Sequence, residues 1–129
     1  MTNTSLAPIA GAEVKNAAFW GHDGKALASF YATALGWTLT QTYGDSAAMI
    51  SDGTTSYVFY TAEDFQAPNW PEDELVLHLD LGFDDVQAAE QNLLAAGATK
   101  PDHQPGGSHW TVLLDPSGQP FCISSNDAW

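Results

Sequence analysis

Positive charge is scarce in this sequence, which has three lysine and arginine residues against 16 aspartate and glutamate residues in a chain of 129. The formal net charge of −13 repels the phosphates of nucleic acids and the surfaces of anionic membranes. We therefore expect neither nucleic acid nor membrane as a partner. A salt-rich habitat would also favour this acidic excess, because a highly charged surface stays soluble there.

Cysteine is almost absent, with Cys122 as the single residue of its kind. One cysteine excludes a disulfide within the chain and a zinc site built from several thiolates. Apolar runs are short, and none approaches the roughly 18 to 20 residues that cross a bilayer. The N-terminus has neither the basic start nor the apolar centre of a signal peptide. These absences predict a cytoplasmic protein.

The residues that are present suffice for one folded domain. With 44% hydrophobic and 12% aromatic residues, the chain is long enough to bury a core and too short for two ordinary domains. The first dozen residues are small and polar, so we expect residues 1–12 to form a flexible tail. A single domain at 13–129 follows.

A β-α-β-β-β pattern occurs twice along this domain. In the first unit, about residues 13–62, VKNAAFW predicts a strand, Asp23 is placed to cap a helix, and Gly36 is placed to end it. WTLTQTY, SAAMIS and TTSYVFYTA then predict three strands. In the second unit, about residues 75–125, LVLHLDL predicts a strand, and a helix follows that ends at Gly97.

The spacing of turn and cap residues also repeats. Gly21-x-Asp23 to Gly36 and Gly82-x-Asp84 to Gly97 have the same internal spacing, which indicates a duplicated unit. Near the end of the chain, DPSG suits a type I turn between the strands WTVLL and QPFCISS. A complete second unit requires one further strand between Gly97 and Trp110.

Three motifs in this order, SFYATALGW, LHLDLGFDD and LLDPSGQPFC, resemble the vicinal oxygen chelate superfamily. This superfamily includes the glyoxalases, bleomycin resistance proteins and extradiol dioxygenases, and the resemblance covers residues 13–125. It implies an α+β fold in which two βαβββ modules form a curved, incompletely closed mixed sheet around a cavity, with the helices outside. The same scaffold hosts enzymes and metal-free binding proteins, so fold alone does not give function.

The resemblance also implies where a metal would bind. In metal-dependent members, four side chains from both modules point into the cavity, and His78 stands at one of these positions. The other three fall on Asn16, Tyr60 and Cys122, none of which is the expected histidine, glutamine or glutamate. A shift of one residue, to Ala17 or Phe59, restores no ligand.

A divalent ion takes three or four histidine or carboxylate donors, and one imidazole with one thiol falls short. We therefore expect no metal cofactor. The alternative is a divalent metal held by His78 with Asp80 or Cys122. If these residues have only a structural role, Asp80 would bind a backbone amide or the start of the helix, and Cys122 would be a small buried hydrophobic residue.

Alternation along the strands predicts which side chains face the cavity. In LVLHLDL the leucines form one apolar face, while His78 and Asp80 share the other. The side chains expected to bind a ligand are Asn16, Trp20, Tyr60, His78, Asp80, Trp110, Cys122 and Ser124. Few of them carry charge and several can hydrogen-bond, which suits an aromatic or planar organic ligand.

Two main functions fit these residues. The first is a metal-independent, small-molecule-binding protein that sequesters a drug or metabolite. The second is a lyase- or isomerase-type enzyme in which His78 is an acid-base group or a metal ligand, with Tyr60 and Cys122 as further catalytic candidates. Asp80 is not expected to orient the His78 ring, because residues two apart on a strand lie about 6.5 to 7 Å apart.

A third possibility is a structural or regulatory domain with a vestigial cavity. In each case an open, curved sheet leaves surface for a second copy, so we expect a homodimer.

Overall fold

The computed structural model describes residue 7 and residues 9–128. Residues 1–6 and 8 of the expected tail lie outside the described residues. The elements in chain order are β1 (Asn16–Gly21), α1 (Gly24–Leu35), β2 (Thr38–Tyr43), β3 (Ala47–Ser51), β4 (Ser56–Thr61), β5 (Asp80–Phe83), α2 (Val86–Ala96), β6 (Thr111–Leu114), β7 (Pro120–Ser125) and a short 3-10 helix, Asn126–Ala128. The expected β-α-β-β-β order is present in full in the first module.

The first module is a four-stranded sheet in the order β1-β4-β3-β2, with β1 parallel to β4 and the other pairs antiparallel. Helix α1 begins where the Asp23 side chain accepts a hydrogen bond from the Ala26 amide at 3.1 Å. It ends at Gly36, whose φ of 71° is left-handed and favours glycine. Its buried side chains include Leu27 and Phe30. Both the predicted cap and the predicted stop are therefore correct.

The second module repeats this layout with one strand fewer. Its sheet has the order β5-β7-β6, with β5 parallel to β7 and β6 antiparallel to β7. Helix α2 ends at Gly97 as expected, but its cap is Asp85, which accepts from the Ala88 amide at 3.0 Å. Asp84, the residue that the repeat spacing matches to Asp23, accepts a hydrogen bond from the Asn126 amide group instead.

The prediction of a strand over LVLHLDL is wrong for residues 75–79. Strand β5 begins only at Asp80, although the Cys122 amide still donates to the Leu79 carbonyl at 2.9 Å. The next amide along β7 in this parallel ladder would belong to Pro120, and proline has no N–H to donate. The ladder therefore stops there, and Val76 and Leu77 lie outside the sheet with 96% and 77% of their surface exposed.

The further strand expected between Gly97 and Trp110 is reduced to one isolated bridge, Thr99 with Leu114. Prolines at 101 and 105 interrupt the backbone donors that a strand would need. The Gln104 side chain takes over part of the pairing: its amide nitrogen donates to the Val112 carbonyl and its oxygen accepts from the Val112 amide, both at 2.9 Å. This double hydrogen bond holds the 98–110 loop against β6.

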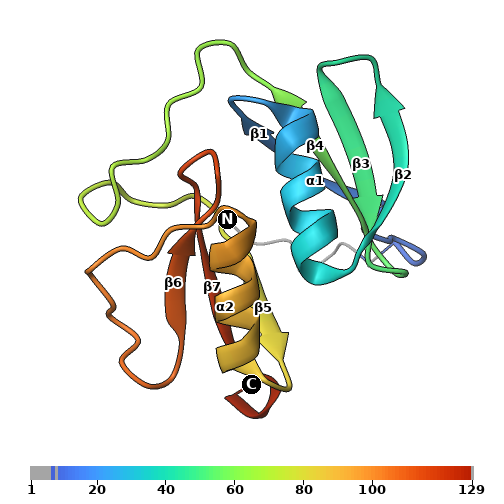
Figure 1. Cartoon of the computed structure of the whole chain (residues 1–129). Coiled ribbons are helices and arrows are strands. Elements are labelled where there is room, and N and C mark those ends of the chain that lie inside the picture. The colour runs from blue at the N-terminus through green and yellow to red at the C-terminus, as the bar shows by residue number, and fades with distance from the viewer. Residues whose placement is uncertain (1–6, 8, 129) are drawn as a thin grey trace.

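The two modules share one hydrophobic core although their sheets are separate. Figure 1 shows the first module at the upper right and the second at the lower left, with the linker from β4 to β5 arching beside them. The buried cluster contains residues of both, among them Phe59 and Ile50 from the first and Phe121 and Leu113 from the second. The α+β class with two repeated units and sheets that do not close is thus confirmed, with the curved sheet divided into four and three strands.

One buried hydrogen bond also joins the modules. The Tyr31 hydroxyl on α1 donates to Asp115 Oδ2 at 2.8 Å, and both residues are buried. The other Asp115 oxygen accepts from the amides of Ser117 and Gln119 and so fixes the predicted turn between β6 and β7. Among the described residues, no helix is both long and apolar enough to span a bilayer.

Candidate functional site

A cavity of about 590 Å³ lies on the second module. We call it the second-sheet pocket. Strands β6 and β7, the start of β5, the linker and the 98–110 loop all contribute to it. Its lining residues are Trp70, Leu75, His78, Asp80, Pro105, His109, Trp110, Val112, Pro120, Cys122, Ser124 and Ala128. This volume is within the range of small-molecule pockets, and most of the lining side chains are apolar or aromatic.

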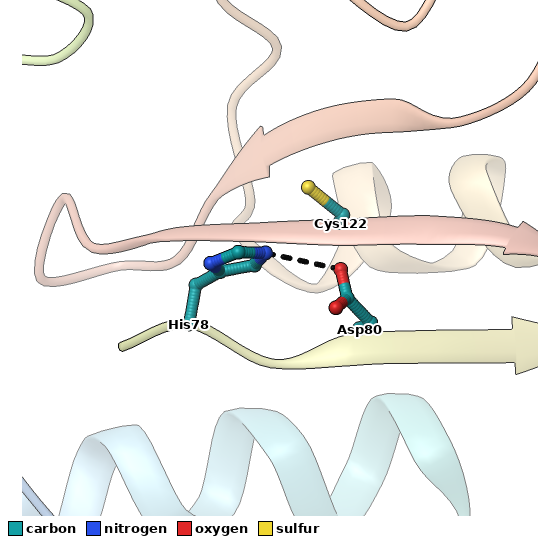
Figure 2. A group of neighbouring side chains, drawn as sticks. All are labelled: His78, Asp80 and Cys122. Atoms are coloured by element: carbon teal, nitrogen blue, oxygen red, sulfur yellow. Dashed lines mark hydrogen bonds and ion pairs between the residues drawn. The ribbon is translucent and has the colours of Figure 1, made fainter. Parts of the chain in front are cut away.

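Three polar side chains meet at one wall of this pocket. His78 Nε2 and Asp80 Oδ1 lie 3.1 Å apart, and one donor atom from each of His78, Asp80 and Cys122 lies within 4.8 Å of the others (Figure 2). The expectation that Asp80 does not orient the His78 ring is therefore wrong. His78 precedes the regular part of β5, so its side chain is free to turn along the chain towards Asp80.

The Cys122 thiol is held in its neutral form. Partial burial, and then the negative charge of the nearby Asp80 carboxylate, raise the pKa of Cys122 to about 11. At neutral pH the residue is a weakly polar thiol and only a small fraction is thiolate. This argues against the activated cysteine that a nucleophilic mechanism would need.

Two tryptophans form the aromatic walls. The Trp110 side chain is 41% exposed and packs over Gly106, where any added Cβ would collide with the indole ring. Trp70 comes from the linker, and its ring lies 5.2 Å from that of His103. Gly106 is buried under the Trp110 ring.

Ser124 adds a hydroxyl group deep in the same pocket. The residue is 3% exposed, and among the described residues its Oγ is a buried side-chain oxygen without a hydrogen-bond partner. A buried hydroxyl usually finds a partner, since leaving it unpaired costs about 1–3 kcal/mol. A hydrogen-bonding group on a ligand would supply one.

The other expected binding residues lie on the first module. Asn16, Trp20 and Tyr60 are exposed on the first sheet, and Trp20 stacks on Tyr60 with ring centroids 5.2 Å apart. None of the three lines the second-sheet pocket. Of the catalytic candidates, the fold therefore brings His78 and Cys122 together and leaves Tyr60 apart.

A groove of about 370 Å³ lies between the two modules. It is lined on one side by Ala18, Phe19 and Trp20 of β1, and on the other by residues 74–79. Strand β1 is an edge strand of the first sheet, and residues 74–79 lead into β5, an edge strand of the second. The groove thus separates β1 from the segment that precedes β5.

The residues present do not fit the four-donor metal site that the superfamily implies. Asn16 and Tyr60 lie outside the pocket, so two of the four implied positions contribute no donor there. The donors that do meet are the imidazole of His78, the carboxylate of Asp80 and the thiol of Cys122, which would have to bind as a thiolate.

Sequence reasoning missed several features of the pocket. Gln104 was not singled out, because its role depends on both carbonyl and amide of Val112 being within reach. Val112 and Pro120 were read only as strand residues, although they line the pocket floor. Trp70 and His109 also line the pocket, and no pattern in the chain distinguishes them from other aromatic residues.

Comparison with known proteins agrees with this architecture. The glyoxalase-like domain family matches residues 15–124. Among solved structures, a possible glyoxalase from Bacillus cereus has a TM-score of 0.67 at 15% identity, covering 88% of this chain and 99% of that one. A glyoxalase/bleomycin resistance protein/dioxygenase family enzyme from Burkholderia phytofirmans has a TM-score of 0.68 at 20% identity, covering 88% and 98%.

A bleomycin resistance determinant encoded on the transposon Tn5 has a TM-score of 0.58 at 17% identity, covering 90% of this chain and 99% of that one. No curated protein matches the chain. At these identities the solved structures establish the fold, and the family match spans most of the sequence. The chain belongs to the glyoxalase-like domain family, within the vicinal oxygen chelate superfamily.

Proposed function

We propose that this protein binds a planar or aromatic organic molecule in the second-sheet pocket, without a metal, and so sequesters a drug or metabolite. The observation that carries this proposal is the pocket itself: about 590 Å³, with Trp70 and Trp110 as aromatic walls and a small group of polar atoms at one side. Such a combination of apolar surface and few polar groups is typical of small-molecule sites.

The bleomycin resistance determinant among the similar structures supports the same class of function. Its fold resembles this chain over 90% of the length, and it is a determinant of resistance to the drug bleomycin. The neutral thiol of Cys122 and the exposed position of Tyr60 leave His78 without the catalytic partners expected from the sequence.

Binding can be measured with N-phenyl-1-naphthylamine, a neutral aromatic dye whose fluorescence rises in apolar pockets. We expect saturable binding that is weakened about tenfold by Trp110→Ala, since losing an aromatic wall removes on the order of 1–2 kcal/mol of apolar contact. Tyr43→Ala is the matched control, because Tyr43 is also 41% exposed and lies on β2, away from the pocket. Equal binding by both variants, or no binding by the native chain, would contradict the proposal.

Metal independence is tested separately. Elemental analysis of protein purified without a histidine tag is expected to give far less than one equivalent of zinc, nickel, iron or manganese. One equivalent that disappears in His78→Ala would overturn this part of the proposal and favour a metal held by His78 with Asp80 or Cys122.

The second candidate function is a lyase- or isomerase-type enzyme, which one observation favours: His78 and Asp80 form a hydrogen-bonded pair open to the pocket. An imidazole that contacts a carboxylate is suited to moving a proton. Mass spectrometry of a bound compound after incubation distinguishes the two functions. A compound recovered unchanged supports sequestration, whereas a change that His78→Ala abolishes supports an enzyme.

The same proposal includes a homodimer in the cytoplasm, where the free Cys122 thiol would stay reduced. Val76, Leu77 and the Trp20–Tyr60 stack all expose apolar surface beside the groove between the modules. Apolar surface of this kind is favourable to bury against a second copy. Light scattering is expected to give twice the chain mass of 13.8 kDa.

A single charged substitution tests the proposed dimer interface. Leu77→Glu is expected to give the monomer mass, while Leu39→Glu, on the exposed strand β2 of the first sheet, leaves the dimer intact. A native chain that is monomeric at all concentrations would contradict the dimer, without bearing on the pocket.

A further inference from the structure

Besides Cys122, the ionisable side chains that line the second-sheet pocket are two imidazoles, His78 and His109, and one carboxylate. Among its lining residues, Asp80 is the single carboxylate, and no lysine or arginine contributes to the wall. The Asp80 side chain is 43% exposed, and the His78 imidazole contacts one of its two oxygens. A ligand entering the pocket therefore meets a negative group on an otherwise apolar surface.

No lysine lines the pocket to compensate an anionic ligand. Each of the three lysines lies beside a carboxylate: Lys15 with Glu13 at 3.0 Å, Lys25 with Asp45 at 3.7 Å, and Lys100 with Glu90 at 3.1 Å. The overall charge of −13 adds to the unfavourable field for an anion. A cation is attracted by the same field.

The aromatic walls favour the same sign of charge. The face of an indole ring is negative, and a cation within about 6 Å of its centre is attracted to it. Trp70 and Trp110 both line the pocket that contains Asp80. A positively charged ring system can therefore stack on tryptophan while its charge lies near the carboxylate.

We infer that the second-sheet pocket selects planar aromatic cations, such as a nitrogen heterocycle with a permanent positive charge, over neutral and anionic compounds of the same shape. The inference rests on the proposed binding function and specifies its ligand class. The cationic end of the ligand lies against Asp80, and its rings lie against Trp70 and Trp110.

Ser124 is a second polar residue of the pocket wall, and the strand pairing sets its distance from Asp80. In the parallel pairing of β5 and β7, Asp80 lies opposite Cys122 and Gly82 lies opposite Ser124. The carboxylate and the unpartnered hydroxyl are thus offset by two residues along the sheet, about 7 Å. That separation is close to the length of a two-ring system, so a ligand of this size with its charge at Asp80 extends along the wall as far as Ser124.

Three compounds of nearly equal size test this selection by isothermal titration calorimetry: 1-methylquinolinium as cation, quinoline as neutral compound at neutral pH, and 1-naphthoate as anion. We expect 1-methylquinolinium to bind at least about tenfold more tightly than quinoline, the ratio given by one contact between opposite charges in a partly buried site. Binding of 1-naphthoate is expected to be the weakest. Added salt should reduce the preference for the cation.

Two variants identify the group responsible. Asp80→Asn keeps the shape of the pocket and is expected to make 1-methylquinolinium and quinoline bind alike, with quinoline little changed. Asp45→Asn changes the net charge by the same amount on a fully exposed residue of the β2–β3 turn, and should preserve the preference. Circular dichroism verifies that both variants are folded.

The outcomes separate this inference from the proposed function. Equal binding of cation and neutral compound by the native chain, or loss of the preference in Asp45→Asn, would overturn charge selection while the pocket remains a binding site. Failure of all three compounds and of the neutral dye would overturn the binding function, and the inference with it.

Discussion

The two modules are built from the same β-α-β-β-β unit and present different faces to solvent. The first module has a complete four-stranded sheet whose exposed face carries the Trp20–Tyr60 stack. The second lacks a regular strand, and the loop in its place, fixed by Gln104, encloses a pocket with the sheet. A strand that is lost from a repeated unit thus makes room for a cavity.

The two modules also differ in the polar side chains that their sheets carry. The face of the first sheet has an amide and a phenol at the positions expected for metal ligands, Asn16 and Tyr60, whereas the second has His78, Asp80 and Cys122 within 4.8 Å of one another. The polar side chains of the candidate site are therefore concentrated in the second module.

Substitutions in the shared core are expected to have the largest effect, and they test whether the two modules unfold together. Leu27 on α1 and Leu93 on α2 are 2% and 1% exposed in one buried cluster. We expect Leu27→Ala and Leu93→Ala each to lower the free energy of unfolding by about 2–5 kcal/mol, within a single transition. Urea unfolding followed by tryptophan fluorescence and circular dichroism measures this. Two transitions, of which each variant shifts one, would show independent modules.

The thiol of the second module is expected to be unusually slow to react. A pKa of about 11 leaves Cys122 with roughly a hundredfold less thiolate near neutral pH than an ordinary cysteine. Alkylation by iodoacetamide, followed by mass spectrometry, should be correspondingly slow and should accelerate in urea. Asp80→Asn removes a charge that raises the pKa, so it should increase the rate in the folded state. A native rate equal to that in urea would contradict this environment.

The Tyr31–Asp115 hydrogen bond between the modules is expected to make the stability of the protein depend on pH. Burial raises the pKa of Tyr31 well above its ordinary value, and the adjacent Asp115 carboxylate raises it further. The unfolded chain releases this proton near pH 10 and the folded protein keeps it, so stability is present in full below about pH 10 and is lost as pH rises further.

Tyr31→Phe is therefore expected to flatten the alkaline loss of stability. Near neutral pH the same variant should cost about 1–3 kcal/mol, because a buried oxygen of Asp115 loses its donor. Urea unfolding near pH 7 and above pH 10 measures both effects. Some alkaline decline should remain, since burial also raises the pKa of Tyr57. An unchanged slope in Tyr31→Phe would assign the decline to other groups.

Substitutions of the two helix caps are expected to change the free energy of unfolding least, and by similar amounts in the two modules. Asp23 and Asp85 each accept one hydrogen bond from a first-turn amide, at 3.1 and 3.0 Å. Asp23→Ala and Asp85→Ala are each expected to cost about 1 kcal/mol by thermal or urea unfolding. Asp84→Ala tests the competing assignment from the repeat spacing, and a larger loss there than in Asp85→Ala would contradict the observed cap.

The sequence predicts the elements that depend on local chemistry. Both helices, with their stops at Gly36 and Gly97, and the turn at Asp115 are where glycine, aspartate and apolar spacing indicate them. The part that fails depends on partners far along the chain. Leucine alternation predicts a strand over 75–79, but the ladder ends because the opposing residue is Pro120.

The site was less predictable than the fold. Alternation places His78 and Cys122 on one face, and they do meet at one wall of the pocket. It also assigns Asn16, Trp20 and Tyr60 to the same cavity, which assumes that the two sheets close around a common space within the chain. How two separate sheets are oriented depends on the packing of α1 and α2, which no strand pattern records. The function of these residues stays a prediction.

Gly106 gives the pocket an adjustable boundary. The indole of Trp110 occupies the space that a side chain at 106 would take, and both residues lie on a loop outside the shared core. One methyl group at position 106 would thus displace this aromatic wall together with the backbone at Trp110. A single substitution in a loop outside the shared core would therefore reshape the proposed binding pocket.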